Sequence, residues 1–187
     1  MNEIYCDWAA TALFDTELLE KAYKTSIEFA GNPSSVHQKG IDAKYALQNA
    51  RKRCATSLGV KEENIIFTSG GTESNHIAIL SLLNRPVKGS ILVSSLEHPA
   101  IREQAEMMKK CGWQVYKIPS DENGIITAES VIKAMKDDTA LVSVMAVNNE
   151  TGSIMPIYEI SDALTKHCAG KRRPKFHVDA VQAAGKI

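Results

Sequence analysis

Residues 65–75 constrain this chain most, because they join a short apolar run, a pair of glycines and the start of a helix. Residues 65–67 are β-branched or aromatic, which predicts a buried strand. Gly70 and Gly71 permit backbone angles closed to other residues and let a ligand come close. Apolar residues recur at helical spacing over 72–83, which predicts a helix. The first amides of a helix lack internal partners and lie at its positive end, so this turn is a candidate anion site.

A single phosphate group is the anion that fits this turn best. The lysine of a Walker A loop and the glycine spacing of the dinucleotide fingerprint are both absent. The helix dipole contributes only ~0.3–1 kcal/mol. Amides and the hydroxyls of Ser69 and Thr72 must therefore supply most of the binding. The same turn also occurs with a purely structural role, and both interpretations stand at this point.

A regular alternation of strands and helices follows the glycine turn. Strands are expected at 65–67, 90–94, 113–118, 140–147 and 176–178, and helices at 72–83, 99–111, 128–135 and 157–168. This order predicts an α/β fold, a three-layer sandwich with a mainly parallel sheet, whose ligands bind at the carboxyl ends of the strands. Two further helices are expected earlier, one up to Ala30 and one that ends at Gly59. We expect an extended segment and helix over 1–33 and the sheet domain over 34–187.

Composition excludes several classes of function. Lys and Arg together number 22, as do Asp and Glu, so no charge excess favours nucleic acid. The basic run at 171–175 is interpreted as a solvated loop. The apolar run at 140–147 is too short to span a bilayer. The histidines show no metal-ligand spacing, so we predict no metal site.

The cysteines and the first residues indicate a reducing compartment. The four cysteines are widely spaced without a CxxC pair, so neither a zinc site nor a disulfide framework is expected. Residues 1–4 lack the basic start and apolar run of a signal peptide. A cytoplasmic location and no membrane association are therefore expected.

Polar clusters follow the predicted strands and suggest one shared pocket. They lie at 69–72, 97–99, 148–152 and 179–182. A phosphate cradle, an aromatic ring, an amide and a carboxylate are what pyridoxal phosphate needs. Asp179 is placed to keep the pyridine nitrogen protonated, and Gln182 to bond the phenolic oxygen. Simpler roles remain open: a helix start for His98, a turn for Asn149 and a helix cap for Asp179.

Six short motifs occur along the chain: Y-x-D-x-A-A-T at 5–11, G-N-P-S-S-x-H at 31–37, F-T-S-G-G-T-E-S at 67–74, E-H at 97–98, V-N-N-E-T-G at 147–152 and H-V-D-A-x-Q-x-x-G at 177–185. In this order they resemble the amino-terminal part of a cysteine desulfurase of the NifS/IscS kind, in the class-V aminotransferase family. Any one motif is weak, whereas the ordered set is highly specific. The resemblance implies the partial large domain of a fold type I transferase dependent on pyridoxal phosphate.

The resemblance implies a role for each matching residue. Gly71 and Thr72 would hold the cofactor phosphate. His98 would stack on the ring and act catalytically by moving protons. Asn149 and Gln182 would lie near the phenolic oxygen of the cofactor, and Asp179 would pair with its ring nitrogen. Asn32 would belong to a loop at the mouth of the substrate site.

The resemblance also implies an activity. L-cysteine would be converted to L-alanine with sulfur left as an enzyme persulfide, in sulfur metabolism and iron–sulfur cluster assembly. A homodimer and a sulfur-acceptor protein would be its partners. The alternatives are a selenocysteine lyase, another aminotransferase or a non-catalytic fragment that binds a partner. A Rossmann-type oxidoreductase is more distant, because the glycine fingerprint is missing.

The departures from the family pattern lead to a further expectation. The Schiff-base lysine of the S-x-H-K motif is absent, and Lys186 matches a different position. None of the cysteines matches the family's mobile catalytic one. We therefore expect a truncated chain that is inactive alone, in which residues 65–67 lack the late strand that pairs with them.

Overall fold

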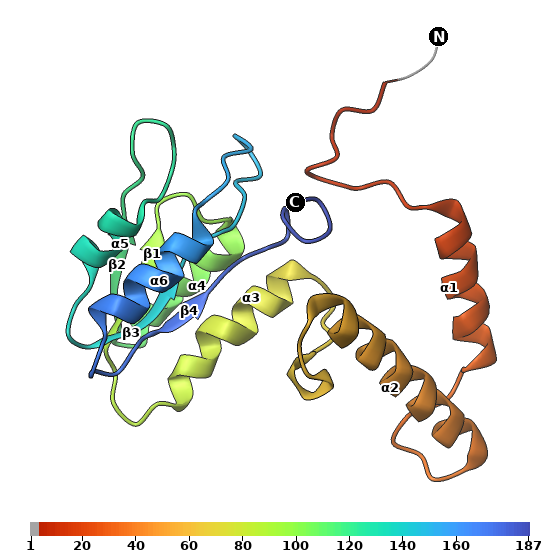
Figure 1. The fold of residues 1–187 in the computed structure, drawn as a ribbon. Coiled ribbons are helices and arrows are strands. Elements are labelled where there is room, and N and C mark those ends of the chain that lie inside the picture. Colours follow the sequence, from red (N-terminus) through yellow and green to blue (C-terminus); the bar gives the residue numbers. More distant parts are fainter. Residues whose placement is uncertain (1–3) are drawn as a thin grey trace. The chain divides into compact units, whose positions relative to one another are not determined.

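The computed structural model describes residues 4–187 and divides them into two compact units (Figure 1). The first unit ends at Phe67 and the second runs from Thr68 to Ile187. Each unit is described by itself. The division into 1–33 and 34–187 inferred from the sequence stays a prediction. Within residues 4–187, no helix combines the length and apolarity needed to cross a membrane.

The first unit contains two helices, α1 (Thr16–Glu28) and α2 (Gln38–Leu58). Asp15 caps α1 by accepting a hydrogen bond from the Leu18 amide at 2.9 Å. Gly59 ends α2 at φ 65°, a conformation that favours glycine. Both helices therefore begin or end where the sequence predicts. No residue of α1 is buried, and its large apolar side chains are exposed: Leu18, Leu19, Tyr23 and Ile27.

The strand predicted at 65–67 is wrong. A short 3₁₀ turn, Glu62–Asn64, precedes these residues, which are extended but pair with none of the described strands. Arg51 takes the role of a partner, because its guanidinium donates to the Ile65 carbonyl and lies 4.9 Å from the centre of the Phe67 ring. β-Propensity describes what fits a pleated surface, and it does not supply the neighbouring strand.

The second unit is built on a four-stranded parallel sheet with the order β2-β1-β3-β4. Its strands are β1 (Ser90–Ser94), β2 (Gln114–Ile118), β3 (Thr139–Ser143) and β4 (Lys175–His177). The predicted parallel sheet is confirmed. β3 ends at Ser143, short of the expected 140–147, and further along the chain Val147 bridges Ile154.

Helices cover both faces of this sheet, which confirms the three-layer sandwich. The helices are α3 (Gly71–Leu80) with a 3₁₀ turn at Ser81–Asn84, α4 (Pro99–Lys110), α5 (Ala128–Ala134) and α6 (Ile157–His167). Ile91 and Val93 of β1 join the cluster formed with α3 and α4. Leu92 joins the opposite cluster, with α5 and α6. Successive residues of a strand point to opposite faces, so the short β1 anchors both cores.

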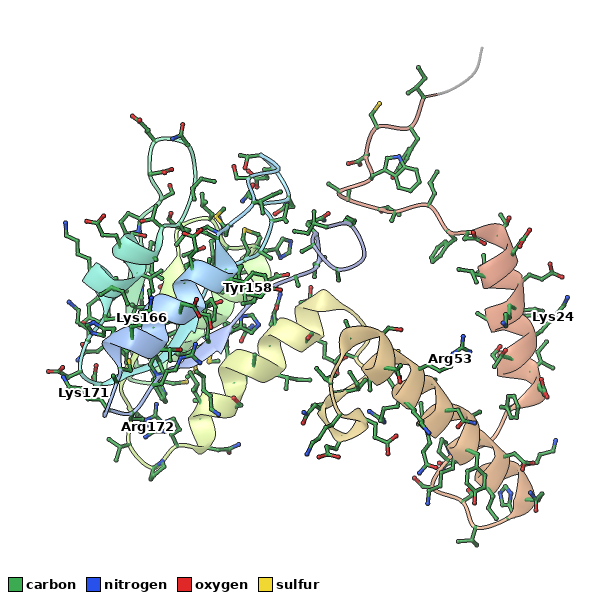
Figure 2. All side chains as sticks on the ribbon, in the orientation of Figure 1. Lys24, Arg53, Tyr158, Lys166, Lys171 and Arg172 are labelled. Atoms are coloured by element: carbon green, nitrogen blue, oxygen red, sulfur yellow. The ribbon has the colours of Figure 1, made fainter. Side chains whose placement is uncertain are left out.

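Truncation of Leu164 is expected to destabilise the second unit by about 3 kcal/mol, because it leaves a cavity in the core under α6. Leu164 is 0% exposed. Tyr158, labelled on the same helix in Figure 2, is 89% exposed and supplies the matched control. Urea unfolding of Leu164→Ala and Tyr158→Ala measures both effects. A similar loss in the two variants would contradict the assignment of the core.

Candidate active site

The glycine turn and the segment after β4 lie at the same rim of the second unit. The side-chain nitrogen Nδ2 of Asn75, in α3, donates to Asp179 Oδ2 at 2.8 Å. A Cβ added at Gly71 would lie 2.6 Å from Val181 Cγ2, so the Val181 side chain packs directly against the Gly71 backbone. Thr72 is three residues before Asn75 on the same helix, which is less than one helical turn. The first turn of α3 is therefore beside Asp179.

Asp179 is a buried and oriented carboxylate. Asp179 is only 7% exposed. Oδ2 accepts from Asn75, and Oδ1 accepts from the Val181 amide at 3.0 Å. The Asp179 carbonyl accepts from the Ala146 amide at 2.8 Å, which joins this segment to the one after β3. Because each carboxylate oxygen can accept two hydrogen bonds, Asp179 retains capacity for another N–H donor.

Ser69, expected to donate to a phosphate, donates to Glu73 in this structure. Glu73 Oε2 accepts from the Ser69 amide at 2.5 Å and from its hydroxyl at 2.7 Å, and these bonds lower the pKa of Glu73. The only hydroxyl hydrogen of Ser69 is thus directed at Glu73. Gly70, which has no side chain, makes no side-chain cap at the start of α3, and Thr72 is exposed in the first turn.

His98 is both a helix cap and an exposed ring. Its Nδ1 accepts from the Ala100 amide at 3.2 Å, and Pro99 occupies the first position of α4. The helix-start role that the sequence left open is thus present. Because Nδ1 is an acceptor, the neutral ring carries its hydrogen on Nε2. The cap fixes the ring in the loop after β1, where His98 is exposed.

Asn149 is held at the rim by its neighbour Asn148, whose importance sequence reasoning missed. The Asn148 side chain is 6% exposed, and Oδ1 accepts from the amides of Glu150 at 3.0 Å and Thr151 at 2.8 Å. This is an Asx turn, and Gly152 closes the loop at φ 74°. Asn149 itself is half-buried. The sequence signal for this Asx turn was an asparagine followed, four residues later, by a glycine.

Gln182 and Asn32 lie in different units. Gln182 is half-buried, follows Val181 and accepts at Oε1 from Lys186 Nζ at 2.7 Å. Asn32 belongs to the first unit, where it is exposed and its side chain accepts from the Ser34 amide at 2.9 Å. The second unit therefore brings together Gly71, Thr72 and Asp179, with Gln182 on the same segment as Asp179, while Asn32 is described only within its own turn.

Glu97 is a buried acid that sequence reasoning left without a role. It is 2% exposed, and its Oε1 accepts from Ser94 Oγ and from the Met145 amide, each at 2.7 Å. Oε2 is buried and has no hydrogen-bond partner among the described residues. Burial raises the pKa of Glu97 to about 7, more than the two hydrogen bonds lower it, and the charge of Asp179 adds to the increase.

The stability of the second unit is expected to fall as the pH rises from 4.5 to about 7. Folded Glu97 holds its proton over that range, whereas the unfolded side chain loses it near 4.5. The folded state therefore binds more protons, and ionisation costs up to about 3 kcal/mol. Urea unfolding across this pH range should show the loss in the unmodified chain and a flatter profile in Glu97→Gln. Burial lowers the pKa of His177, but this contribution is common to both proteins. Parallel profiles would contradict the assignment.

Comparison with known proteins identifies the family. The aminotransferase class-V model matches residues 4–187. This chain belongs to the class-V aminotransferase family. Membership agrees with the ordered motifs in the sequence and gives no support to a Rossmann-type oxidoreductase.

The class-V relatives of this chain include proteins named cysteine desulfurases. It is 38% identical over 187 residues to the putative cysteine desulfurase IscS 1 of Bacillus subtilis, covering 99% of the chain and 48% of that protein. The solved NifS-like protein superposes with a TM-score of 0.88 at 35% identity, covering 97% and 49% of the two chains. SspA in complex with cysteine gives 0.85 at 31%, covering 96% and 51%. The chain spans about half the length of the curated relatives it matches.

Proposed function

We propose that this chain carries the cofactor-binding part of a cysteine desulfurase dependent on pyridoxal phosphate. The observation that carries the proposal is the buried carboxylate of Asp179, held by Asn75 beside the glycine turn of α3. A buried carboxylate needs a compensating partner, and a protonated pyridine nitrogen is such a partner. The relatives named cysteine desulfurases support the same assignment.

The phosphate of the cofactor would be held at the first turn of α3. The amides of Gly71 and Thr72 lie at the positive end of the helix, and the exposed Thr72 hydroxyl adds a donor. Gly71 has no side chain, which leaves its backbone amide accessible to a phosphate, and a side chain at this position would meet Val181. Glu73 already occupies part of this end through Ser69, so the phosphate would rely on Gly71 and Thr72 rather than on Ser69.

The remaining site residues would orient the cofactor ring and move protons at the substrate. When bound, pyridoxal phosphate supplies a ring that accepts electrons from the substrate's α-carbon. His98 would stack on that ring and move a proton through Nε2, because its Nδ1 is engaged by Ala100. Asn149 and Gln182 would donate to the phenolic oxygen, with the Gln182 amide oriented by Lys186. Asn32 would contribute to the substrate mouth.

L-cysteine is the proposed substrate, and L-alanine with a persulfide sulfur the proposed products. A solved relative holds cysteine, which supports this class of amino acid. A cytoplasmic location, a homodimer and a sulfur-acceptor protein of iron–sulfur cluster assembly complete the proposal. The 187 residues contain no S-x-H-K motif, so this polypeptide alone would bind the cofactor without a Schiff base and would not turn over.

Titration of the chain with pyridoxal phosphate tests the proposal. We expect saturable quenching of protein fluorescence, and after borohydride treatment and denaturation the cofactor should separate from the protein. L-cysteine should then give no sustained sulfide from this polypeptide alone. Absence of saturable binding would contradict the cofactor assignment, and sustained sulfide release would contradict the proposed inactivity. Titration of the cofactor-loaded chain with cysteine, selenocysteine and an amino acid that lacks sulfur and selenium compares their affinities, and this comparison separates a desulfurase from a selenocysteine lyase or an aminotransferase.

A second candidate function, partner binding without catalysis, is favoured by α1. None of its residues is buried, although Leu18, Tyr23 and Ile27 are large and apolar. Exposed apolar surface of this kind marks association sites. Light scattering over a range of concentrations should show self-association that Leu18→Ser with Tyr23→Ser weakens. A monomer at every concentration would contradict the proposed homodimer.

A further inference from the structure

Two buried polar side chains join the loop that carries His98 to the loop that carries Asn149. Glu97 lies directly before His98, and its Oε1 accepts from the Met145 amide at 2.7 Å. Asn148 lies directly before Asn149, and its Nδ2 donates to the Leu96 carbonyl at 3.2 Å. Each bond starts next to one proposed site residue and ends in the loop that carries the other.

These bonds replace a backbone ladder that has ended. Beyond β3, the amides of Val144 and Ala146 donate to the carbonyls of His177 at 3.1 Å and Asp179 at 2.8 Å, so they serve the β4 side. The Met145 amide alternates with them and points to the opposite neighbour, as in any strand. On that side β1 has already ended at Ser94, and the Ser95 amide donates to Ile118 of β2 instead. The Glu97 carboxyl supplies the missing acceptor.

We propose that Glu97 and Asn148 are positioning residues that fix His98 and Asn149 relative to each other. The inference rests on the proposed function for its consequence, because only a cofactor site needs these two residues in register. Both positioning side chains are buried, at 2% and 6% exposure, so water does not replace their hydrogen bonds. Neither side chain would contact the cofactor itself, and each acts through the residue that follows it.

The chemistry of Glu97 is compatible with this role in its neutral form. Oε1 makes both hydrogen bonds, and Oε2 is buried without a partner among the residues described. A neutral carboxyl keeps the acceptor at Oε1 without placing a second charge near Asp179. Glutamine preserves the same acceptor and the same shape, whereas alanine removes the acceptor. Glu97→Gln is therefore the conservative variant that should retain the fixed loops.

Amide hydrogen exchange tests the connection directly. In Glu97→Ala, exchange of the Met145 amide should accelerate at least ~10-fold more than exchange of the β1 amides, and in Asn148→Ala the Glu150 and Thr151 amides should behave likewise. The His98 ring resonances should broaden in both alanine variants and stay sharp in Glu97→Gln. Glu103→Ala and Asn123→Ala, at exposed positions, are matched controls.

Two outcomes would overturn the inference. One is uniform acceleration of every amide in the second unit, which describes a loss of global stability. The other is an unchanged His98 ring in the alanine variants. Affinity for pyridoxal phosphate is the separate readout of function: it should fall ~10-fold in Glu97→Ala and recover in Glu97→Gln. If the unmodified chain binds no cofactor, the proposed function fails, while exchange and ring resonances still decide whether the loops are held.

Discussion

Asp179→Ala is expected to weaken the binding of pyridoxal phosphate by roughly 10–150-fold. A hydrogen bond to a charged group contributes about 1.5–3 kcal/mol, and the alanine variant cannot offer one to the ring nitrogen. The same substitution leaves the buried Asn75 amide without its acceptor at 2.8 Å, which should destabilise the second unit by about 1–3 kcal/mol. Both losses come from one carboxylate.

Fluorescence titration and urea unfolding measure the two losses separately. Asp179→Asn keeps the size of the side chain and one of its two acceptor oxygens but removes the charge, so affinity should fall with a smaller loss of stability than in Asp179→Ala. Asp162→Ala, at an exposed site on α6, should change unfolding by less than about 0.5 kcal/mol. Full affinity in a folded Asp179→Asn variant would disprove the pairing with the ring nitrogen.

Gly71→Ala is expected to weaken cofactor binding ~10-fold or more and to destabilise the second unit by less than the ~1–3 kcal/mol of overpacking in a core, because Val181 is 56% exposed. The new Cβ would lie 2.6 Å from Val181 Cγ2, a distance that requires the helix turn or the Val181 side chain to move. A shift of the helix turn displaces the Thr72 amide relative to Asp179, where the phosphate and the ring nitrogen would be held.

Shortening Val181 provides the test of this explanation. The double variant Gly71→Ala with Val181→Ala removes the atom that the new Cβ meets, so stability and affinity should both recover. Val181→Ala alone should have little effect, because Val181 is 56% exposed. Equal losses in the single and double variants would show that Gly71 is required for a reason other than space.

Local signals in the sequence were sufficient for most helices and strands of the second unit. β1 has the expected bounds, because its buried apolar run is flanked by turns. α4 begins at Pro99, where a proline suits the first helical position. The parallel order of the strands predicted that the site residues gather at the edge of the sheet where the strands end, and Asp179 and Gly71 do lie near each other there.

The errors arise where a residue's partner is distant or unforeseen. Residues 65–67 have the composition of a strand, but a strand also needs a neighbour, and Arg51 holds this segment instead. The hydrogen bond from the Ser69 hydroxyl to Glu73, four residues later, was likewise not foreseen, and a phosphate role for Ser69 stays a prediction. The hydrogen bonds of Glu97 and Asn148 cross between loops, and sequence pattern carries no information on such pairs.

The order of the strands in the sheet has a consequence for folding. β1 is made before any of its neighbours, and its first residue, Ser90, pairs with Gln114 of β2 and later with Thr139 of β3. The nearer pairing closes the shorter loop and has the smaller entropic cost. During synthesis, β1 would therefore join β2 first and present an open edge of unpaired N–H and C=O groups until β3 arrives. This interval is when a chaperone would be of most use to the nascent chain.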